Sequence, residues 1–174
     1  MNNIALPLFS VSPAEIIAQL PYIAGSASLV VHTAGGTSDP FSFTILPQAP
    51  AIFQEGGLVQ VFRMDNNEPV NFTNPVHPNS ELIIYLAGLG LTTPLPALGT
   101  AAPSNPMALV TAPPTVTLGG APMTVVTAAL VPGQIGVYAI IVKAPGTVQN
   151  SPSTPLTITA GTISATYSVR VVSP

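Results

Sequence analysis

The stretch Phe41-Ser42-Phe43-Thr44-Ile45 alternates large apolar side chains with small hydroxyl side chains at every second position. Successive side chains of a β-strand point to opposite faces, so this pattern predicts a strand with one apolar and one polar face. The same alternation returns in residues 156–160 and in residues 166–171. Residues 82–86 and 137–142 are instead continuous apolar runs, which predicts central strands that are covered on both faces.

Prolines separate these runs and exclude long helices. The chain contains 21 prolines, which recur from Pro7 to Pro174. Because proline lacks a backbone N–H and clashes with the preceding turn, few stretches could form a helix. Residues 94–106 and 147–155 are proline-rich and predict loops. Turns are predicted at Gly35-Gly36, Asp65-Asn66-Asn67, Gly119-Gly120 and Gly161. The sequence therefore predicts an all-β fold.

The composition excludes two classes of partner. Only 5% of the 174 residues are charged, whereas a typical soluble domain has about 25%. With three Lys and Arg in total and a net charge of −3, the chain has no basic face for nucleic acid. The longest apolar run, residues 82–91, contains two glycines and is far shorter than the ~20 residues of a membrane-spanning helix. We therefore expect no transmembrane segment.

Two parts of the chain carry the same landmarks in the same order, which indicates an internal repeat. The first copy has Pro7, Ser12-Pro13, Gln19-Leu20-Pro21, Thr33-Ala34-Gly35 and residues 41–45. The second copy has Pro122, Val131-Pro132, Lys143-Ala144-Pro145, Thr159-Ala160-Gly161 and residues 167–171. Residues 51–120 precede the second copy and have no counterpart in the first. We therefore predict a partial repeat over residues 1–47 and a complete domain over residues 48–174.

Several segments resemble a known bacterial family. They are residues 3–22, Gln48-Ala49-Pro50-Ala51-Ile52-Phe53, Leu86-Ala87-Gly88-Leu89-Gly90 and residues 116–122. Together they resemble the uncharacterised C-terminal domain of secreted acidobacterial proteins. Each copy also resembles, more loosely, the immunoglobulin-like domain shared by plexins and some transcription factors. The resemblance implies tandem immunoglobulin-like β-sandwiches, one complete and one partial, in a secreted or cell-surface protein. It supplies no catalytic or binding residue.

The resemblance also implies that the chain begins inside its first domain. A sandwich without its first strands exposes unpaired backbone groups and an uncovered apolar face. In one interpretation, the remaining strands pack onto the second domain. In the other, the apolar N-terminal run of one chain completes a neighbouring chain and builds a filament. The candidate self-association residues are Ile4, Leu6, Leu8 and Phe9. The predicted function is a non-enzymatic structural or adhesive module that forms homo-oligomers or filaments.

The polar residues predict no catalytic residue, no metal site and no cofactor. His32 and His77 have no second histidine or cysteine at metal-ligand spacing, and no Gly-x-Ser-x-Gly motif occurs. Residues 65–68 leave two interpretations open. They form either a turn of the Asx type or a calcium loop whose ligands are carboxylate and amide oxygens.

A carbohydrate- or ligand-binding module is the alternative function, because sandwiches can present aromatic rings to a surface glycan. The chain has no tryptophan, six Phe and four Tyr. Phe9, Phe41, Phe43 and Tyr167 are in phase with predicted core positions, so we expect these rings to be packed inside. Two coplanar exposed rings would instead favour sugar binding.

Overall fold

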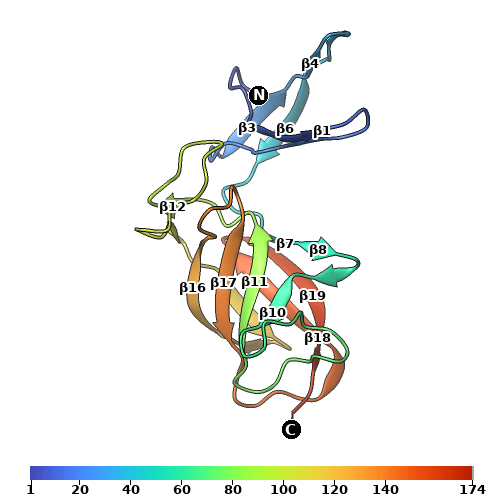
Figure 1. Cartoon of the computed structure of the whole chain (residues 1–174), viewed down its shortest axis with the longest axis vertical. Helices are drawn as coiled ribbons and strands as arrows, with labels where there is room; N and C mark the ends of the chain where they lie inside the picture. The colour runs from blue at the N-terminus through green and yellow to red at the C-terminus, as the bar shows by residue number, and fades with distance from the viewer. Residues whose placement is uncertain (174) are drawn as a thin grey trace.

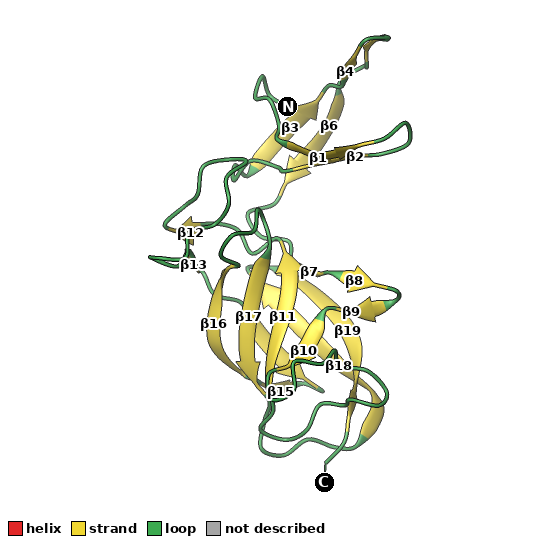
Figure 2. Cartoon of the chain, in the orientation of Figure 1, coloured by secondary structure: helices red, strands yellow, loops and turns green. Residues whose placement is uncertain are grey.

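The computed structural model describes residues 1–173 and confirms the all-β prediction (Figures 1 and 2). Every pair of neighbouring strands is antiparallel. Among the described residues no helix is long and apolar enough to cross a membrane. The strands are β1 (Leu8–Val11), β2 (Ile16–Ala18), β3 (Gly25–Leu29), β4 (His32–Thr33), β5 (Gly36–Thr37), β6 (Phe41–Ile45), β7 (Ala51–Ile52), β8 (Gln54–Glu55), β9 (Leu58–Val59), β10 (Val61–Arg63), β11 (Glu81–Ala87), β12 (Thr92–Thr93), β13 (Leu109–Val110), β14 (Thr115–Leu118), β15 (Ala121–Pro122), β16 (Thr124–Leu130), β17 (Tyr138–Lys143), β18 (Ser151–Ala160) and β19 (Ile163–Val171).

Two sheets facing each other form a β-sandwich from residues 51–171. One sheet has the strand order β10-β11-β17-β16-β13-β12, with β7 also paired to β11. The other has the order β15-β14-β18-β19. Leu82, Ile84 and Ile140 from the first sheet and Leu156 and Ile158 from the second are all completely buried. One shared core therefore holds the two sheets together.

Strand β11 is fully buried on only one of its two faces, which differs from the prediction made from the sequence. The run over residues 82–86 predicted a strand buried on both faces. In the structure, Leu82, Ile84 and Leu86 are buried, whereas Ile83 and Tyr85 on the other face are only half-buried. The outer face is shielded by neighbouring side chains rather than by a further layer. Phe62 on β10, for example, packs edge-on against the Tyr85 ring with 5.8 Å between centroids.

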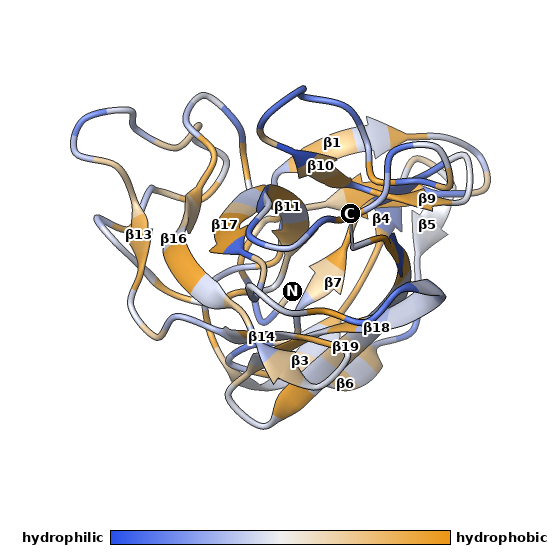
Figure 3. Cartoon of the chain, turned by 90° about the horizontal axis from the view of Figure 1, so that it is seen from below, coloured by the Kyte–Doolittle hydropathy of each residue, from blue (hydrophilic) through white to orange (hydrophobic). Residues whose placement is uncertain are grey.

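The N-terminal strands lie outside this sandwich, as three two-stranded ribbons at one end of the molecule (Figure 1). Within residues 1–47, Pro21 and Ala27 are the only apolar residues that are buried. Phe9 is 49% exposed and Phe41 is 66% exposed, so the prediction that these rings lie in a core was wrong. The reason is that no second sheet covers the ribbons. Figure 3 shows hydrophobic segments on β1 as well as on the sandwich strands β16 and β17.

The N-terminal ribbons follow the strand pairing of the second repeat. β1 pairs with β2 as β16 pairs with β17, and β3 pairs with β6 as β18 pairs with β19. A tight turn precedes each set, with φ of 44° and 62° at Asn2-Asn3 and of 59° and 83° at Gly119-Gly120. In the sandwich, β17 also pairs with β11, and β18 also pairs with β14. Within residues 1–47, no strand takes the corresponding positions beside β2 and β3.

Residues 47–50 join the N-terminal ribbons to the sandwich through close backbone contacts. The Gln48 side-chain amide donates to the carbonyl oxygens of Leu89 at 2.9 Å and Ala112 at 3.0 Å. Gly88 and Gly90 both have φ of +82°, and they leave room for the backbone of Ala49 and Pro47. These glycines therefore leave space for the backbone of the joining segment.

Candidate functional site

The ribbon β3–β6 has two faces of opposite character, as the alternation in residues 41–45 predicted. Cross-strand pairs Ser26–Thr44 and Ser28–Ser42 form a hydroxyl face. Pairs Ala27–Phe43 and Leu29–Phe41 form an apolar face. A hollow of about 510 Å³ lies along the ribbon and is lined mainly by small polar side chains. Its lining residues are Asn2, Ser26, Ala27, Ser28, Ser42, Phe43 and Thr44.

The equivalent ribbon in the sandwich, β18–β19, has the same two faces. Its outer face carries hydroxyl pairs, with 2.9 Å between Thr157 Oγ1 and Thr166 Oγ1 and 2.8 Å between Thr159 Oγ1 and Ser164 Oγ. Its inner face lies in the core, where Ile158 is 0% exposed. The apolar face of β3–β6 therefore resembles the inner face of a sandwich in composition, but no second sheet covers it.

Phe41 and Phe43 form an aromatic pair on that apolar face. Their ring centroids are 6.0 Å apart and their planes differ by 28°. Phe41 is 66% exposed, and Phe43 is half-buried. Sequence reasoning placed both rings in a core because it could recognise the strand but not the missing sheet opposite it.

The structure places the four predicted self-association residues before and within β1. Ile4, Leu8 and Phe9 are exposed, and Leu6 is half-buried. The β1–β2 hairpin carries apolar side chains on both faces, because Val11 pairs with Ile16 on one face while Ile17 points to the other. An isolated two-stranded hairpin is only marginally stable in water, so this hairpin depends on its other contacts.

Gln19 fastens the β1–β2 hairpin to the sandwich. Its side chain is 7% exposed, and its Oε1 accepts a hydrogen bond of 2.7 Å from the backbone N–H of Gly99. Its Nε2 donates to the Tyr22 hydroxyl at 3.3 Å. Sequence analysis recognised Gln19 only as a landmark of the repeat. No local pattern indicated that it would be buried, because its partner lies 80 residues away.

Two tyrosines lie near the same junction. Burial raises the pKa of Tyr22 above its usual value, although its hydrogen bond with Gln19 acts in the opposite direction. Burial also raises the pKa of Tyr138, and the nearby Tyr22 adds to that effect. The Tyr138 hydroxyl donates to the carbonyl oxygen of Gly90. The junction is therefore a partly buried, hydrogen-bonded contact and has the character of a structural joint.

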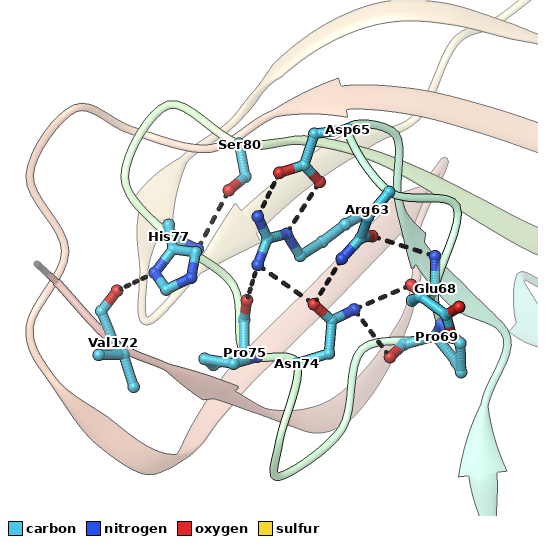
Figure 4. A network of polar contacts seen from close by, with 10 residues as sticks. Arg63, Asp65, Glu68, Pro69, Asn74, Pro75, His77, Ser80 and Val172 are labelled. Atoms are coloured by element: carbon cyan, nitrogen blue, oxygen red, sulfur yellow. Dashed lines mark hydrogen bonds and ion pairs between the residues drawn. The ribbon is translucent and has the colours of Figure 1, made fainter.

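The Asp65 to Glu68 segment is organised around an arginine (Figure 4). The guanidinium of Arg63 makes an ion pair with Asp65 and donates from NH1 to Asn74 Oδ1 at 3.2 Å. Its hydrogen bond to Asp65 holds the pKa of that carboxyl below the usual value. Asn66 Oδ1 accepts from the Glu68 backbone N–H at 3.0 Å, which is an Asx turn.

These contacts show that the turn of the first interpretation is present. Both Asp65 oxygens face a cation of the chain itself, so the carboxylate is already neutralised where a calcium ion would need it. Across residues 1–173, no cluster of three or more His, Cys, Asp or Glu side chains could hold a metal ion. The turn interpretation therefore describes the segment.

The two histidines lie in different parts of the chain. His32 is on the exposed β4–β5 ribbon, with its Nδ1 3.0 Å from Thr37 Oγ1. His77 lies in the loop before β11, where its Nδ1 is 2.7 Å from the Val172 carbonyl oxygen and its backbone N–H donates to Ser80 Oγ (Figure 4). The His77 contact ties this loop to the end of β19.

The three basic residues all lie in strands of the sandwich. Arg63 is in β10, Lys143 ends β17 and Arg170 is in β19. The Arg170 guanidinium carbon lies 4.0 Å from the centre of the Phe72 ring, in a cation–π contact. Residues 1–47 contain no Lys or Arg, and their charged side chains are Glu15 and Asp39.

No family model matches this chain, and neither a curated protein nor a solved structure matches it.

Proposed function

We propose that this chain is a non-enzymatic structural or adhesive module that self-associates through its N-terminal ribbons. The observation that supports the proposal is the contrast between two equivalent faces. On β6, Phe41 is 66% exposed and Phe43 is half-buried, whereas at the corresponding positions of β19 Tyr167 is half-buried and Val169 is 4% exposed. The family resemblance extends the proposal to an immunoglobulin-like module of an exported bacterial surface or extracellular protein.

The proposed occupant of the exposed face is the same face of a second copy. Burial of apolar surface contributes about 25 cal/mol for each Å² removed from water. The apolar face has Leu29, Phe41, Phe43 and Ile45 to bury. Because residues 1–47 carry only Glu15 and Asp39 as charged side chains, two copies meet with little electrostatic repulsion.

Backbone pairing supports the same partner. In the sandwich, β17 has β11 on the side that β2 leaves open. The corresponding edge of β3 is partly occupied, because the backbone N–H of Asn2 donates to Ser28 O at 3.0 Å and its side-chain Oδ1 accepts from the Ser28 N–H at 2.8 Å. The edge of β2 is therefore the better acceptor for a strand of the second copy. The run with Ile4, Leu6, Leu8 and Phe9 supplies apolar side chains for such a strand.

A pair of matched variants tests the proposal. Phe41→Ser removes an exposed ring from the N-terminal ribbon, and Phe72→Ser removes a ring of similar exposure, 71%, from the sandwich. We expect light scattering and negative-stain microscopy to show assemblies for the native chain and for Phe72→Ser. Phe41→Ser and Leu8→Asp should reduce assembly, while circular dichroism shows that the sandwich remains folded. A native chain that stays monomeric at all concentrations would contradict the proposal, as would normal assembly by both N-terminal variants.

A second candidate function is supported by the Phe41–Phe43 pair. The planes of the Phe41 and Phe43 rings differ by 28°, and Phe41 is exposed, so the pair offers aromatic surface on which a sugar ring could stack. Titration with a soluble β-glucan oligosaccharide, followed by NMR, distinguishes the two candidates. Sugar binding predicts saturable shifts that Phe41→Ser abolishes in the monomer. Self-association predicts shifts that follow the protein concentration and do not depend on the sugar.

A further inference from the structure

The strand β19 leaves most of one edge unpaired. On one side it pairs with β18 from Ile163 to Val171. On the other side, Val76 donates to the Arg170 carbonyl oxygen at 2.9 Å and accepts from the Val172 N–H at 3.0 Å. Among the described residues, no other backbone group pairs with that second edge. The edge is therefore closed only near the C-terminal end of β19.

The contact with Val76 identifies which backbone groups lie on the open edge. In a regular strand, the N–H and C=O of every second residue point to the same edge. Because Arg170 points toward Val76, the backbone groups of Ser164, Thr166 and Ser168 point to the same open edge. All three side chains are exposed. This segment has no Lys, Glu or Pro, which are the residues that commonly protect an edge strand from pairing.

The burial of β19 agrees with an open edge. Val169 and Val171, beside Val76, are 4% and 1% exposed. Ile163, Ala165 and Tyr167 point to the same inner face but are only half-buried. Their neighbours on β18, by contrast, are completely buried, as in the case of Ile158. The inner face of β19 is therefore less buried along the part of the strand that has no neighbour on its second edge.

We propose that this edge pairs with the same edge of a second copy, antiparallel and centred on Thr166. In this register Thr166 faces Thr166 of the second copy, and Ser164 faces its Ser168. Each of these pairs exchanges N–H and C=O hydrogen bonds. On the inner face Ile163 meets Val169, and on the outer face hydroxyls meet hydroxyls. Arg170 is already paired with Val76 of its own chain, so the paired segment runs from Ile163 to Val169 and contains no charged side chain.

The second copy fits this edge better than an unrelated strand because the sequence is self-complementary about Thr166. Apolar residues meet apolar residues and polar residues meet polar residues on both sides of that position. Pairing joins two β15-β14-β18-β19 sheets into one continuous sheet. This contact lies on the sandwich and is separate from the N-terminal ribbons (Figure 1). One self-complementary contact gives only a dimer, whereas two separate ones extend into an open filament when their two-fold axes do not close the assembly.

A cysteine at the centre of the register tests the pairing. The chain has no native cysteine, so Thr166→Cys can form a disulfide only with a second copy. Residues facing each other in a hydrogen-bonded pair are about 5.5 Å apart at Cα, which is within the range of a disulfide. Thr115→Cys is the control, because Thr115 is exposed on the same sheet but paired to Thr159. We expect mild oxidation to give a covalent dimer for Thr166→Cys and monomer for Thr115→Cys. Equal yields for the two variants would overturn the proposal.

Three further variants separate loss of pairing from loss of fold. Thr166→Pro removes the edge N–H, and Thr166→Lys keeps it but places two positive charges opposite each other. Thr166→Ala keeps the N–H and adds no charge. Sedimentation velocity should show dimerisation weakened about tenfold or more for the Pro and Lys variants and nearly unchanged for Ala. Retained dimerisation by Thr166→Lys, with native circular dichroism, would contradict the proposed register.

The outcomes distinguish this proposal from the assembly through the N-terminal ribbons. A chain carrying both Phe41→Ser and Thr166→Cys should still cross-link as a dimer but form no filament. If the ribbons do not associate at all, Thr166→Cys should cross-link to the same extent. If β19 does not pair, cross-linking fails while Phe41→Ser still reduces assembly of the otherwise native chain.

Discussion

The backbone N–H of Ala49 donates a 2.8 Å hydrogen bond to the carbonyl oxygen of Gly88, and the carbonyl oxygen of Ala49 fills the space beside the Gly88 α-carbon. A Cβ at position 88 would lie 1.9 Å from that oxygen. This contact holds the segment that leads from the N-terminal ribbons into the sandwich. The position of the ribbons therefore depends on a residue without a side chain.

We predict that Gly88→Ala destabilises the protein by about 2 kcal/mol or more, since a backbone clash adds to the strain of positive φ. Gly120→Ala is the matched control. Its φ is 83°, close to that of Gly88, and a Cβ there would meet no atom within 4 Å. It should lose only about 1 kcal/mol from backbone strain. Urea unfolding of both variants measures the difference, and equal losses would contradict the clash.

Gln19→Ala should loosen the β1–β2 hairpin without unfolding the sandwich. The variant leaves the half-buried Gly99 N–H without its acceptor, which costs about 1 kcal/mol. Hydrogen exchange should become faster at Gly99 and in residues 8–18, and stay slow in β17. Gln54→Ala, on the exposed strand β8, is the control and should change neither region. Unchanged exchange at Gly99 would show that Gln19 does not fasten the hairpin.

Thr154→Val should stabilise the protein. Among the described residues, the hydroxyl of Thr154 is the one buried side-chain polar atom without a hydrogen-bond partner. Replacing it by a methyl group of similar size removes an unpaired polar atom and gains about 1 kcal/mol. Thr157→Val, on the same strand, is the comparison, because it breaks the contact with Thr166 Oγ1. Thermal unfolding should rank Thr154→Val above the native chain and Thr157→Val below it.

The raised pKa of Tyr138 predicts that the protein loses stability at alkaline pH. Its folded-state pKa is raised, chiefly by burial, so the folded chain holds the hydroxyl proton more tightly than the unfolded chain does. This contribution is complete below the ordinary tyrosine pKa of about 10, and it is lost as pH rises above that value toward the folded pKa. Tyr138→Phe should cost about 1 kcal/mol at pH 7, through loss of the hydrogen bond to Gly90, and should flatten the decline above pH 10. Urea unfolding at pH 7 and 11 tests both effects, and an equal decline in the two proteins would contradict the assignment.

Strand positions could be predicted from side-chain alternation, because alternation is local. Residues 41–45 form β6, and residues 156–160 lie in β18, as expected. The predicted loop over residues 147–155 was wrong at its end, since β18 already begins at Ser151. Pro155 is tolerated there because its carbonyl oxygen accepts a hydrogen bond from the Gly119 N–H, so the N–H that proline lacks is not needed for this contact.

Burial could not be predicted in the same way, because it depends on what lies opposite a strand. Phe41 has the pattern of a core residue and lies on the surface, since its ribbon has no facing sheet. Gln19 is a polar residue of a type that usually lies on the surface, but it is buried against Gly99. No local sequence pattern links these two residues. The candidate assembly face was therefore predictable as a set of apolar residues, but its exposure required the structure.

Arg63, Lys143 and Arg170 all lie in strands, and this placement affects how easily trypsin-like proteases can cleave the folded protein. Trypsin-like proteases cut after Lys or Arg, and they need the chain on both sides of the bond to be free to enter their active site. Here every such bond belongs to a strand whose backbone is already paired within a sheet. The loops and the exposed N-terminal ribbons contain none. We therefore expect the folded molecule to be a poor substrate for this class of enzyme.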